Sequence, residues 1–163
     1  MLFRSVRFTG SIHDENGLLT IDRGKMSRKL SHLREKITRH AESLEDVDAD
    51  LDLKAEVLVI SYGAADGAAR EAVQVLRAAG TRVSHLTIYS LWPVPCRALR
   101  RAVTPRVQRV IVPELNIGLY CEVLRAFVAD AAIESVLCFD GRLIPPDLIV
   151  RKAREPSKGR MSE

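Results

Sequence analysis

Apolar residues occur along this chain in two patterns, short unbroken runs and residues spaced three or four apart. The run at 57–60 is too short for a free-standing helix and rich in β-branched side chains, as in a strand covered on both faces of a parallel sheet. Apolar residues then recur at helical spacing from Ala68 to Leu76, and Gly80 suits a helix C-terminus. Residues 57–80 therefore predict one β-turn-α unit, and the rest of the chain repeats it.

Further strands are predicted at 82–88, 107–112 and 135–139, each followed by a helix. Trp92 is expected to plug the end of the sheet. The helix after Gly118 is expected to turn one apolar face inward, formed by Leu119, Val123, Leu124, Phe127 and Val128. This alternation predicts an α/β fold, a three-layer αβα sandwich with a mainly parallel sheet. A short N-terminal strand containing Phe3, Val6 and Phe8 is a candidate fifth member at an edge.

The same patterns divide the chain into four segments. Residues 1–24 are expected to form the edge strand and a polar loop, and 25–54 an amphipathic helix followed by an acidic linker. Residues 55–153 form the α/β core domain, and 154–163 a mobile basic tail. The acidic run at 45–52 lacks the glycine and spacing of a calcium-binding EF-hand loop, so we interpret it as a linker.

Composition narrows the function classes. A chain of 163 residues, 47% of them hydrophobic, suits one domain with a real core. The net charge of +4 and the 5% aromatic content do not favour a dedicated nucleic-acid binder. No signal peptide and no apolar run near the roughly 18–20 residues of a membrane span is present, so a cytoplasmic protein is expected. Three cysteines without a CxxC pair predict buried free thiols rather than a zinc site or iron–sulfur cluster.

Ligands of such sheets gather where the parallel strands end, and we place the candidate site at this rim. Two readings stay open for several of its residues. A helix start after Gly63 can hold a phosphate, or its small residues can simply pack against the sheet. Glu114 is a candidate acid–base group or a hydrogen-bonding partner of a neighbouring loop. The rim residues are Ser61, Gly63, Trp92, Pro93, Glu114, Asn116, Gly118, Asp140 and Arg142.

The N-terminal loop adds His13, Asp14 and Glu15, which are candidate metal ligands or an acid–base group, or polar groups satisfied locally. The chain has no dinucleotide-binding G-x-G-x-x-G, no P-loop and no G-x-S-x-G elbow. We therefore assign no catalytic, cofactor-binding or metal-ligating residue, and interpret these positions as a strand-end rim or subunit interface.

Five short segments together resemble the alpha subunit of 2-oxoacid:ferredoxin oxidoreductases. They are TGSIHDENG at 9–17, the following KM at 25–26 before a charged helix, LWPVP at 91–95, VPELNIG at 112–118 and DGR at 140–142. The PELN form is most similar to the 2-oxoglutarate branch. Two departures are Ile12, where the family usually has Glu, and Leu119-Tyr120, where it usually has Gln.

The resemblance implies a transketolase-C-terminal-like domain, with five strands of which the first is antiparallel. It also implies partners: a pyrimidine-binding alpha domain that precedes this segment, and a beta subunit that binds thiamine diphosphate and magnesium. The complex would oxidatively decarboxylate a 2-oxoacid, expected to be 2-oxoglutarate, to an acyl-coenzyme A and pass electrons through iron–sulfur clusters to ferredoxin. This chain would then be a non-catalytic structural and docking part without a cofactor of its own.

Two other hypotheses compete with that one. The chain can be a stand-alone module that binds a small molecule or anion at its helix starts, as a monomer or a homodimer. Nucleic-acid binding through the basic tail and the long helix is the weaker idea, since it lacks a recognition motif. The sequence leaves open the exact 2-oxoacid, the oligomeric state and whether Met1 is the natural start.

Overall fold

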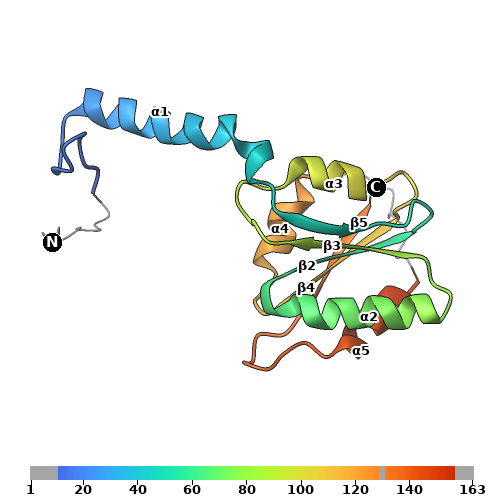
Figure 1. The fold of residues 1–163 in the computed structure, drawn as a ribbon. Helices are drawn as coiled ribbons and strands as arrows, with labels where there is room; N and C mark the ends of the chain where they lie inside the picture. Colours follow the sequence, from blue (N-terminus) through green and yellow to red (C-terminus); the bar gives the residue numbers. More distant parts are fainter. Residues whose placement is uncertain (1–10, 129–130, 157–163) are drawn as a thin grey trace, which may run out of the picture. The chain divides into compact units, whose positions relative to one another are not determined.

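The computed structural model describes residues 11–128 and 131–156 (Figure 1). The chain forms two compact units, Met1–Ala41 and Glu42–Glu163, which we describe separately. The strand expected around Phe3, Val6 and Phe8 lies outside the described residues.

In the N-terminal unit a loop closed by a β-bridge between His13 and Leu19 leads into α1, Arg23–Arg39. Asp22 caps this helix, since its Oδ1 accepts a 2.7 Å hydrogen bond from the Lys25 amide. No residue of α1 is buried. The apolar residues of this helix are therefore at most partly buried.

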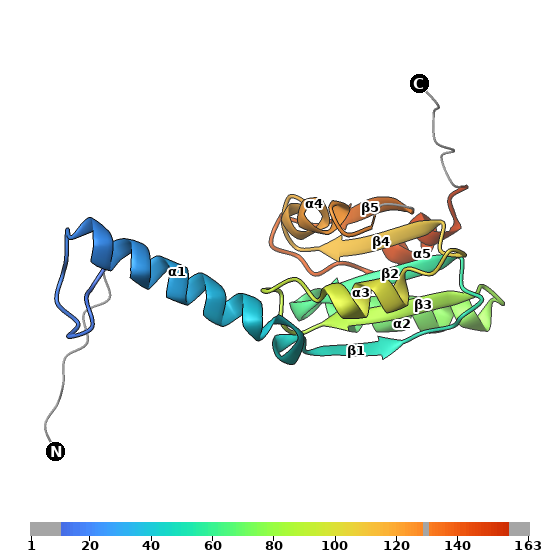
Figure 2. The ribbon, with the colours of Figure 1, turned by 90° about the horizontal axis from the view of Figure 1, so that it is seen from above.

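The second unit begins near the 3₁₀ turn η1, Ala41–Leu44, and contains one five-stranded sheet (Figure 2). The strand order is β1-β3-β2-β4-β5, in which β1 runs antiparallel to β3 and the other pairs are parallel. The mostly parallel sheet with one antiparallel edge strand is thus confirmed. The strands are β1 Val47–Asp50, β2 Val57–Tyr62, β3 Val83–Ile88, β4 Arg109–Glu114 and β5 Ala132–Leu137.

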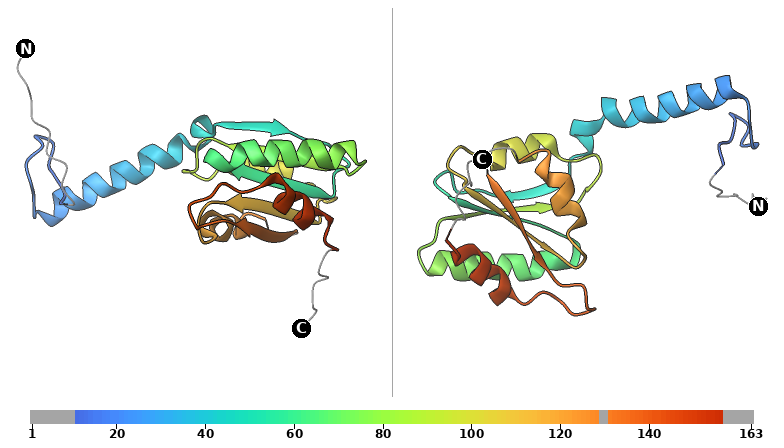
Figure 3. Two further views of the ribbon diagram at one scale, coloured as in Figure 1. Left: turned by 90° about the horizontal axis from the view of Figure 1, so that it is seen from below. Right: turned by 180° about the vertical axis from the view of Figure 1, so that it is seen from behind.

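Helices cover both faces of this sheet, which confirms the three-layer sandwich (Figure 3). Side chains of α2 and α5 pack with Val57, Val59 and Ile111 in one core, and side chains of α3 and α4 pack with Leu58 and Ile60 in the other. Alternate residues of β2 thus enter opposite cores, as the pleat requires. The helices are α2 Asp66–Ala78, preceded by the 3₁₀ turn η2 Gly63–Ala65, α3 Cys96–Ala102, α4 Leu119–Arg125 and α5 Pro146–Arg154.

The antiparallel edge strand comes from the acidic segment that we expected to be a linker. Asp48 and Asp50 point toward α2, where they pair with Arg70 at 2.9 Å and Arg77 at 2.6 Å. These two arginines lie more than twenty residues away along the chain. The sequence around the two aspartates therefore does not reveal their partners, which only the fold brings close. Glu45 is also used, because its carboxylate accepts the amides of Arg97 and Ala98 at the start of α3.

One expectation about apolar residues is right only in part, and another is wrong. The buried face of α4 is formed by Tyr120, Cys121 and Leu124. Of the residues expected to face inward, Leu124 and Val128 are buried, whereas Leu119, Val123 and Phe127 are exposed. Trp92 does not plug the sheet, since it is 73% exposed. Both differences leave large apolar side chains in solvent.

The three cysteines are free, and Cys121 is buried while Cys96 and Cys138 are partly buried. Among the described residues, no helix combines the length and the apolar character needed to cross a membrane.

Candidate functional site: the strand-end rim

The loops after β2, β3, β4 and β5 all leave the sheet at the same end, where the carboxyl ends of these parallel strands lie together. We call this end of the sheet the strand-end rim. The start of β1 lies there too, since Val47 pairs with Ile88, the last residue of β3. The chain therefore enters the sheet from the N-terminal unit at the rim.

Glu114 is the central polar residue of the rim, and its side chain is fully buried. One carboxylate oxygen accepts hydrogen bonds from the Tyr62 hydroxyl at 2.8 Å and from the Tyr120 amide at 2.9 Å. The other accepts from the Cys121 amide at 3.0 Å. The carboxylate thus binds the free amides of the first turn of α4, where the helix dipole favours negative charge.

Tyr62 connects this carboxylate to the next loop. Its hydroxyl donates to Glu114 and accepts from the Asn116 side-chain amide at 2.9 Å. Burial raises the pKa of Tyr62 to about 12, and the neighbouring carboxylate of Glu114 adds to the rise. Tyr62 therefore stays a neutral donor and holds Glu114 as an acceptor.

Asn116 and Gly118 shape the turn before α4. Asn116 Oδ1 accepts the amides of Gly118 and Leu119, while Gly118 has φ +97°. A side chain at Gly118 would be strained by this left-handed backbone, although its Cβ would make only an ordinary contact with Leu137, at 3.7 Å. Asn116 therefore supports the start of α4, and Gly118 is the N-cap residue.

Around this polar centre the rim exposes large apolar side chains. Ile117 is 68% exposed on the loop after β4, and Trp92 is joined to Pro93 by a cis peptide bond on the loop after β3. Isolated exposed apolar residues are normal on soluble proteins, whereas a contiguous patch of them is the usual mark of an interaction surface. The exposed apolar rim residues are Leu91, Trp92, Leu115, Ile117, Leu119, Phe139 and Leu143.

Ser61 lies on the opposite face of β2 from Tyr62 and is fully buried. Its hydroxyl donates to Asp66 Oδ1 at 2.7 Å and lies 2.8 Å from His85 Nε2. Burial would raise the pKa of Asp66, but hydrogen bonds from Thr87, Arg70 and Ser61 outweigh it and lower the pKa. Ser, His and Asp meet here inside the protein, so they join α2 to the sheet rather than act on a ligand.

The remaining predicted residues do not join the Glu114 network. Gly63, with φ +54°, begins η2 beside a cavity of about 90 Å³. That is smaller than the roughly 300 Å³ at which small-molecule pockets begin. Asp140 and Arg142 form an exposed ion pair after β5, in which Arg142 Nε donates to Asp140 at 2.8 Å.

His13, Asp14 and Glu15 belong to the N-terminal unit. Asp14 Oδ1 accepts the amides of Asn16 and Leu18, and its other oxygen lies 3.5 Å from Lys25 Nζ. These hydrogen bonds, that of Leu18 first, lower the pKa of Asp14. Asp14 is therefore satisfied within its own loop, as the simpler interpretation predicted.

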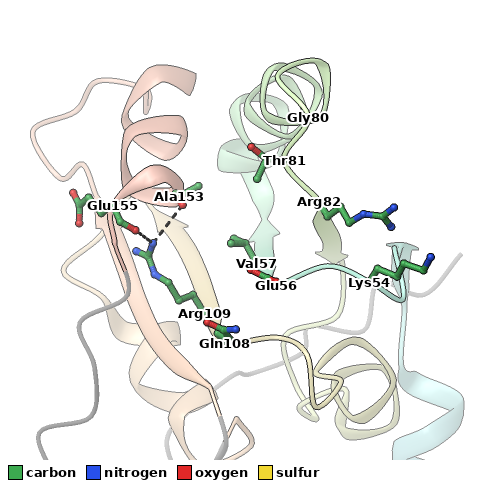
Figure 4. A pocket seen from close by; sticks show the side chains of 10 residues that line it. All are labelled: Lys54, Glu56, Val57, Gly80, Thr81, Arg82, Gln108, Arg109, Ala153 and Glu155. Carbon is green, nitrogen blue, oxygen red and sulfur yellow. Dashed lines mark hydrogen bonds between the residues drawn. The ribbon is translucent and has the colours of Figure 1, made fainter.

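The other end of the sheet is different, because a cavity of about 430 Å³ lies there among charged side chains (Figure 4). Arg109, the first residue of β4, is buried at this cavity, and its side chain points toward the end of α5. Its guanidinium donates to the carbonyls of Lys152 and Ala153 and to Glu134. These donors are used in holding the C-terminus of α5, where a cation is favourable.

No cluster of three or more His, Cys, Asp or Glu that could hold a metal ion occurs in residues 11–128 and 131–156. Nor does the rim fit a diphosphate group, since Glu114 uses both oxygens within the fold and the cavity beside Gly63 is small. Sequence reasoning missed Tyr62, Asp66, His85 and Tyr120. Only the position of Tyr62 at the end of an apolar strand could have indicated its place at the rim.

Comparisons with known proteins identify relatives of most of the chain. Residues 55–149 match the family described as pyruvate:ferredoxin oxidoreductase core domain II. The chain is 33% identical over 144 residues to the 2-oxoglutarate synthase subunit KorA of Methanothermobacter thermautotrophicus, which covers 87% of this chain and 38% of that protein. It is 34% identical over 125 residues to the 2-oxoglutarate oxidoreductase subunit KorA of Mycobacterium tuberculosis, over 76% of this chain and 18% of that protein.

The solved structures include a 2-oxoglutarate:ferredoxin oxidoreductase from Magnetococcus marinus with 2-oxoglutarate, coenzyme A and succinyl-CoA bound. It matches with a TM-score of 0.69 and 27% identity, over 89% of this chain and 25% of that one. The chain thus spans less than half the length of the curated relatives named above.

Proposed function

This chain belongs to the pyruvate:ferredoxin oxidoreductase core domain II family, and we propose that it is the structural and docking part of a thiamine-diphosphate-dependent 2-oxoacid:ferredoxin oxidoreductase. The substrate class that we propose is 2-oxoglutarate, because the relatives named above carry that substrate in their names. The complex would oxidise and decarboxylate the 2-oxoacid, transfer the acyl group to coenzyme A and reduce ferredoxin, in the cytoplasm.

The observation that carries the docking role is the combination of an apolar rim and a fully engaged polar centre. Trp92, Ile117 and Leu119 are each more than half exposed, while the carboxylate of Glu114 is buried and occupied. A surface built for chemistry would leave such a group free toward the ligand. Here Glu114 instead holds the start of α4, next to Ile117 and Leu119.

The proposed partners are the beta subunit that binds thiamine diphosphate and magnesium, and the pyrimidine-binding alpha domain. We call these two together the catalytic assembly. Iron–sulfur clusters and coenzyme A would also belong to the complex outside this chain. Apolar residues at the centre of an interface with a polar surround are the usual arrangement of a stable subunit contact.

The test is reconstitution with the catalytic assembly from the same organism. We expect the purified chain alone to show no heat of thiamine diphosphate binding, and to restore 2-oxoglutarate-dependent dye reduction when added to the assembly. Tight binding of thiamine diphosphate by the chain alone would overturn the docking role. It would favour the alternative, a stand-alone module that binds an anion near Gly63, especially if replacing Gly63 by a residue with a side chain abolished the binding.

A further inference from the structure

Helix α1 carries one narrow apolar stripe, and none of its residues is buried. Met26, Leu30, Leu33 and Ile37 follow one another at intervals of four, three and four residues. This spacing places them on one face of the helix. Leu30 and Leu33 are 53% and 47% exposed, and no residue of the helix is buried.

Such a helix gains little stability by itself. Isolated helices below about 12–15 residues are marginal in water and most helical stability in proteins comes from packing an apolar face. The 17 residues of α1 exceed that length only slightly. A surface that covers the stripe would therefore contribute to the order of the helix.

The charges of α1 restrict what can cover the stripe. Seven of the 17 residues are Arg or Lys and only Glu35 is acidic. At 100° per residue, Lys29 and Lys36 flank the stripe on one side and Arg23 and Arg34 on the other. The complementary surface is thus an apolar groove with carboxylates along both edges.

A second copy of α1 does not fit. In heptad terms Leu30 and Ile37 occupy a positions, Met26 and Leu33 occupy d positions, and Lys29, Arg34 and Lys36 occupy e and g positions. Pairing two such helices would place cations opposite cations in either direction. Like charges at these positions exclude self-pairing.

A membrane surface fits less well than a protein groove. Interfacial helices present a broad apolar face with Trp or Phe as well as Leu. The stripe of α1 is one residue wide and has no aromatic side chain. Anchors spaced i, i+4, i+7 and i+11 are instead the pattern of a helix bound in a protein groove.

We propose that α1 docks its apolar stripe into a carboxylate-edged groove on the catalytic assembly, and this inference rests on the proposed function for the identity of that partner. The connection supports it, since the chain passes from α1 through η1 into β1 at the strand-end rim. One partner can then receive both the rim and the helix.

The experiment measures binding of the full chain to the immobilised catalytic assembly, together with hydrogen exchange of α1. The test variant is Leu30→Ala with Leu33→Ala, which keeps helix propensity because Ala is the best helix former. The matched control is Ser31→Ala on the opposite face of the same helix. We expect the test variant to lose affinity roughly 30-fold or more, as anchor residues do, and the control to stay within about 3-fold.

Hydrogen exchange and charge reversal sharpen the result. The α1 amides should exchange rapidly in the chain alone and slowly in the complex. Lys29→Glu with Arg34→Glu should lower affinity about 10-fold or more and flatten its dependence on salt, since the flanking charges then repel the groove.

Each contrary outcome has a separate meaning. If the wild-type chain does not bind the assembly, the proposed function fails and the inference fails with it. If the wild type binds and the Leu30 and Leu33 variant binds equally well, only the inference is overturned. Slow exchange of α1 in the chain alone, or dimers that this variant abolishes, would also overturn it, because the stripe would then be covered without the assembly.

Discussion

Two polar networks meet the last two residues of β2 from opposite faces of the sheet, and they are built from different groups. Ser61 contacts Asp66 and His85, and Asp66 pairs with Arg70 at 2.7 Å. We call this the α2-face network. Tyr62 contacts Glu114 and Asn116, and we call these residues, with the amides of Tyr120 and Cys121, the α4-face network.

The difference lies in how each network neutralises its carboxylate. Asp66 is paired with a cation, and Arg70 reaches on to Asp48 of the edge strand at 2.9 Å. Glu114 accepts hydrogen bonds from a hydroxyl and two backbone amides, all neutral. The α2-face network thus ties α2 to β1 through an ion pair and to β2 and β3 through hydrogen bonds. The α4-face network instead stabilises a buried carboxylate with neutral donors only. Apolar side chains can therefore dominate the rim.

The largest effect on stability should follow from a substitution of Glu114, whose carboxylate has no cationic partner in the α4-face network. Glu114→Gln replaces one acceptor oxygen by an NH₂ group that faces backbone donors. We expect a loss of about 2–3 kcal/mol in the free energy of unfolding, because buried donors are left without an acceptor. Urea denaturation at pH 7 measures it.

Tyr62→Phe is the graded control for that change. It removes one hydroxyl from the α4-face network but leaves the two amides on Glu114, so about 1 kcal/mol is expected. A Glu114→Gln protein as stable as the wild type would show that the α4-face network does not hold the rim.

The α2-face network should respond to pH because it contains a buried base. Burial lowers the pKa of His85 below its ordinary value of 6.5, against the opposing attraction of Asp66, with Arg70, Asp50 and Asp48 also acting on it. The unfolded chain therefore binds the proton more tightly than the folded one. Stability from this group is fully present above about pH 6.5 and is lost as the pH falls toward the folded pKa.

The slope expected for one such proton is at most about 1.4 kcal/mol per pH unit. Urea denaturation of the wild type between pH 7 and pH 5 should show it, and His85→Gln should reduce it. An unchanged slope in that variant would assign the acid sensitivity to other groups.

Strands β2 and β4 could be predicted from the sequence because each contains an apolar run covered on both faces. Val57, Leu58, Val59 and Ile60 are all buried in consequence. The edge strand β1 could not, because its Asp48 and Asp50 depend on Arg70 and Arg77 of a later helix. The spacing of apolar and polar residues along the chain does not show that a charged side chain has a partner far away in the sequence.

The position of the rim could be predicted from the sequence, but the groups that hold it together could not. Parallel strands place their ends together, so the rim followed from topology, and Glu114 and Asn116 do meet there. Tyr62 and His85 were missed because their partners come from other strands. The prediction that Leu119 and Val123 face inward was wrong. These side chains are as apolar as the buried Leu124, and hydrophobicity alone does not distinguish a core face from an exposed one.

The smallest effect on stability should come from the apolar side chains that the α4-face network presents, and this makes them the most specific test of its purpose. Ile117 is 68% exposed, so Ile117→Ser should change the free energy of unfolding by no more than about 0.5 kcal/mol. The same change should weaken binding to the catalytic assembly about 10-fold or more, if the rim is the docking surface. Val75→Ser, on an exposed position of α2, is the matched control and should alter neither quantity. A loss of stability above about 1 kcal/mol in Ile117→Ser would mean that this side chain packs within the chain, and the contrast between a network that ties the sheet and one that presents a surface would then be wrong.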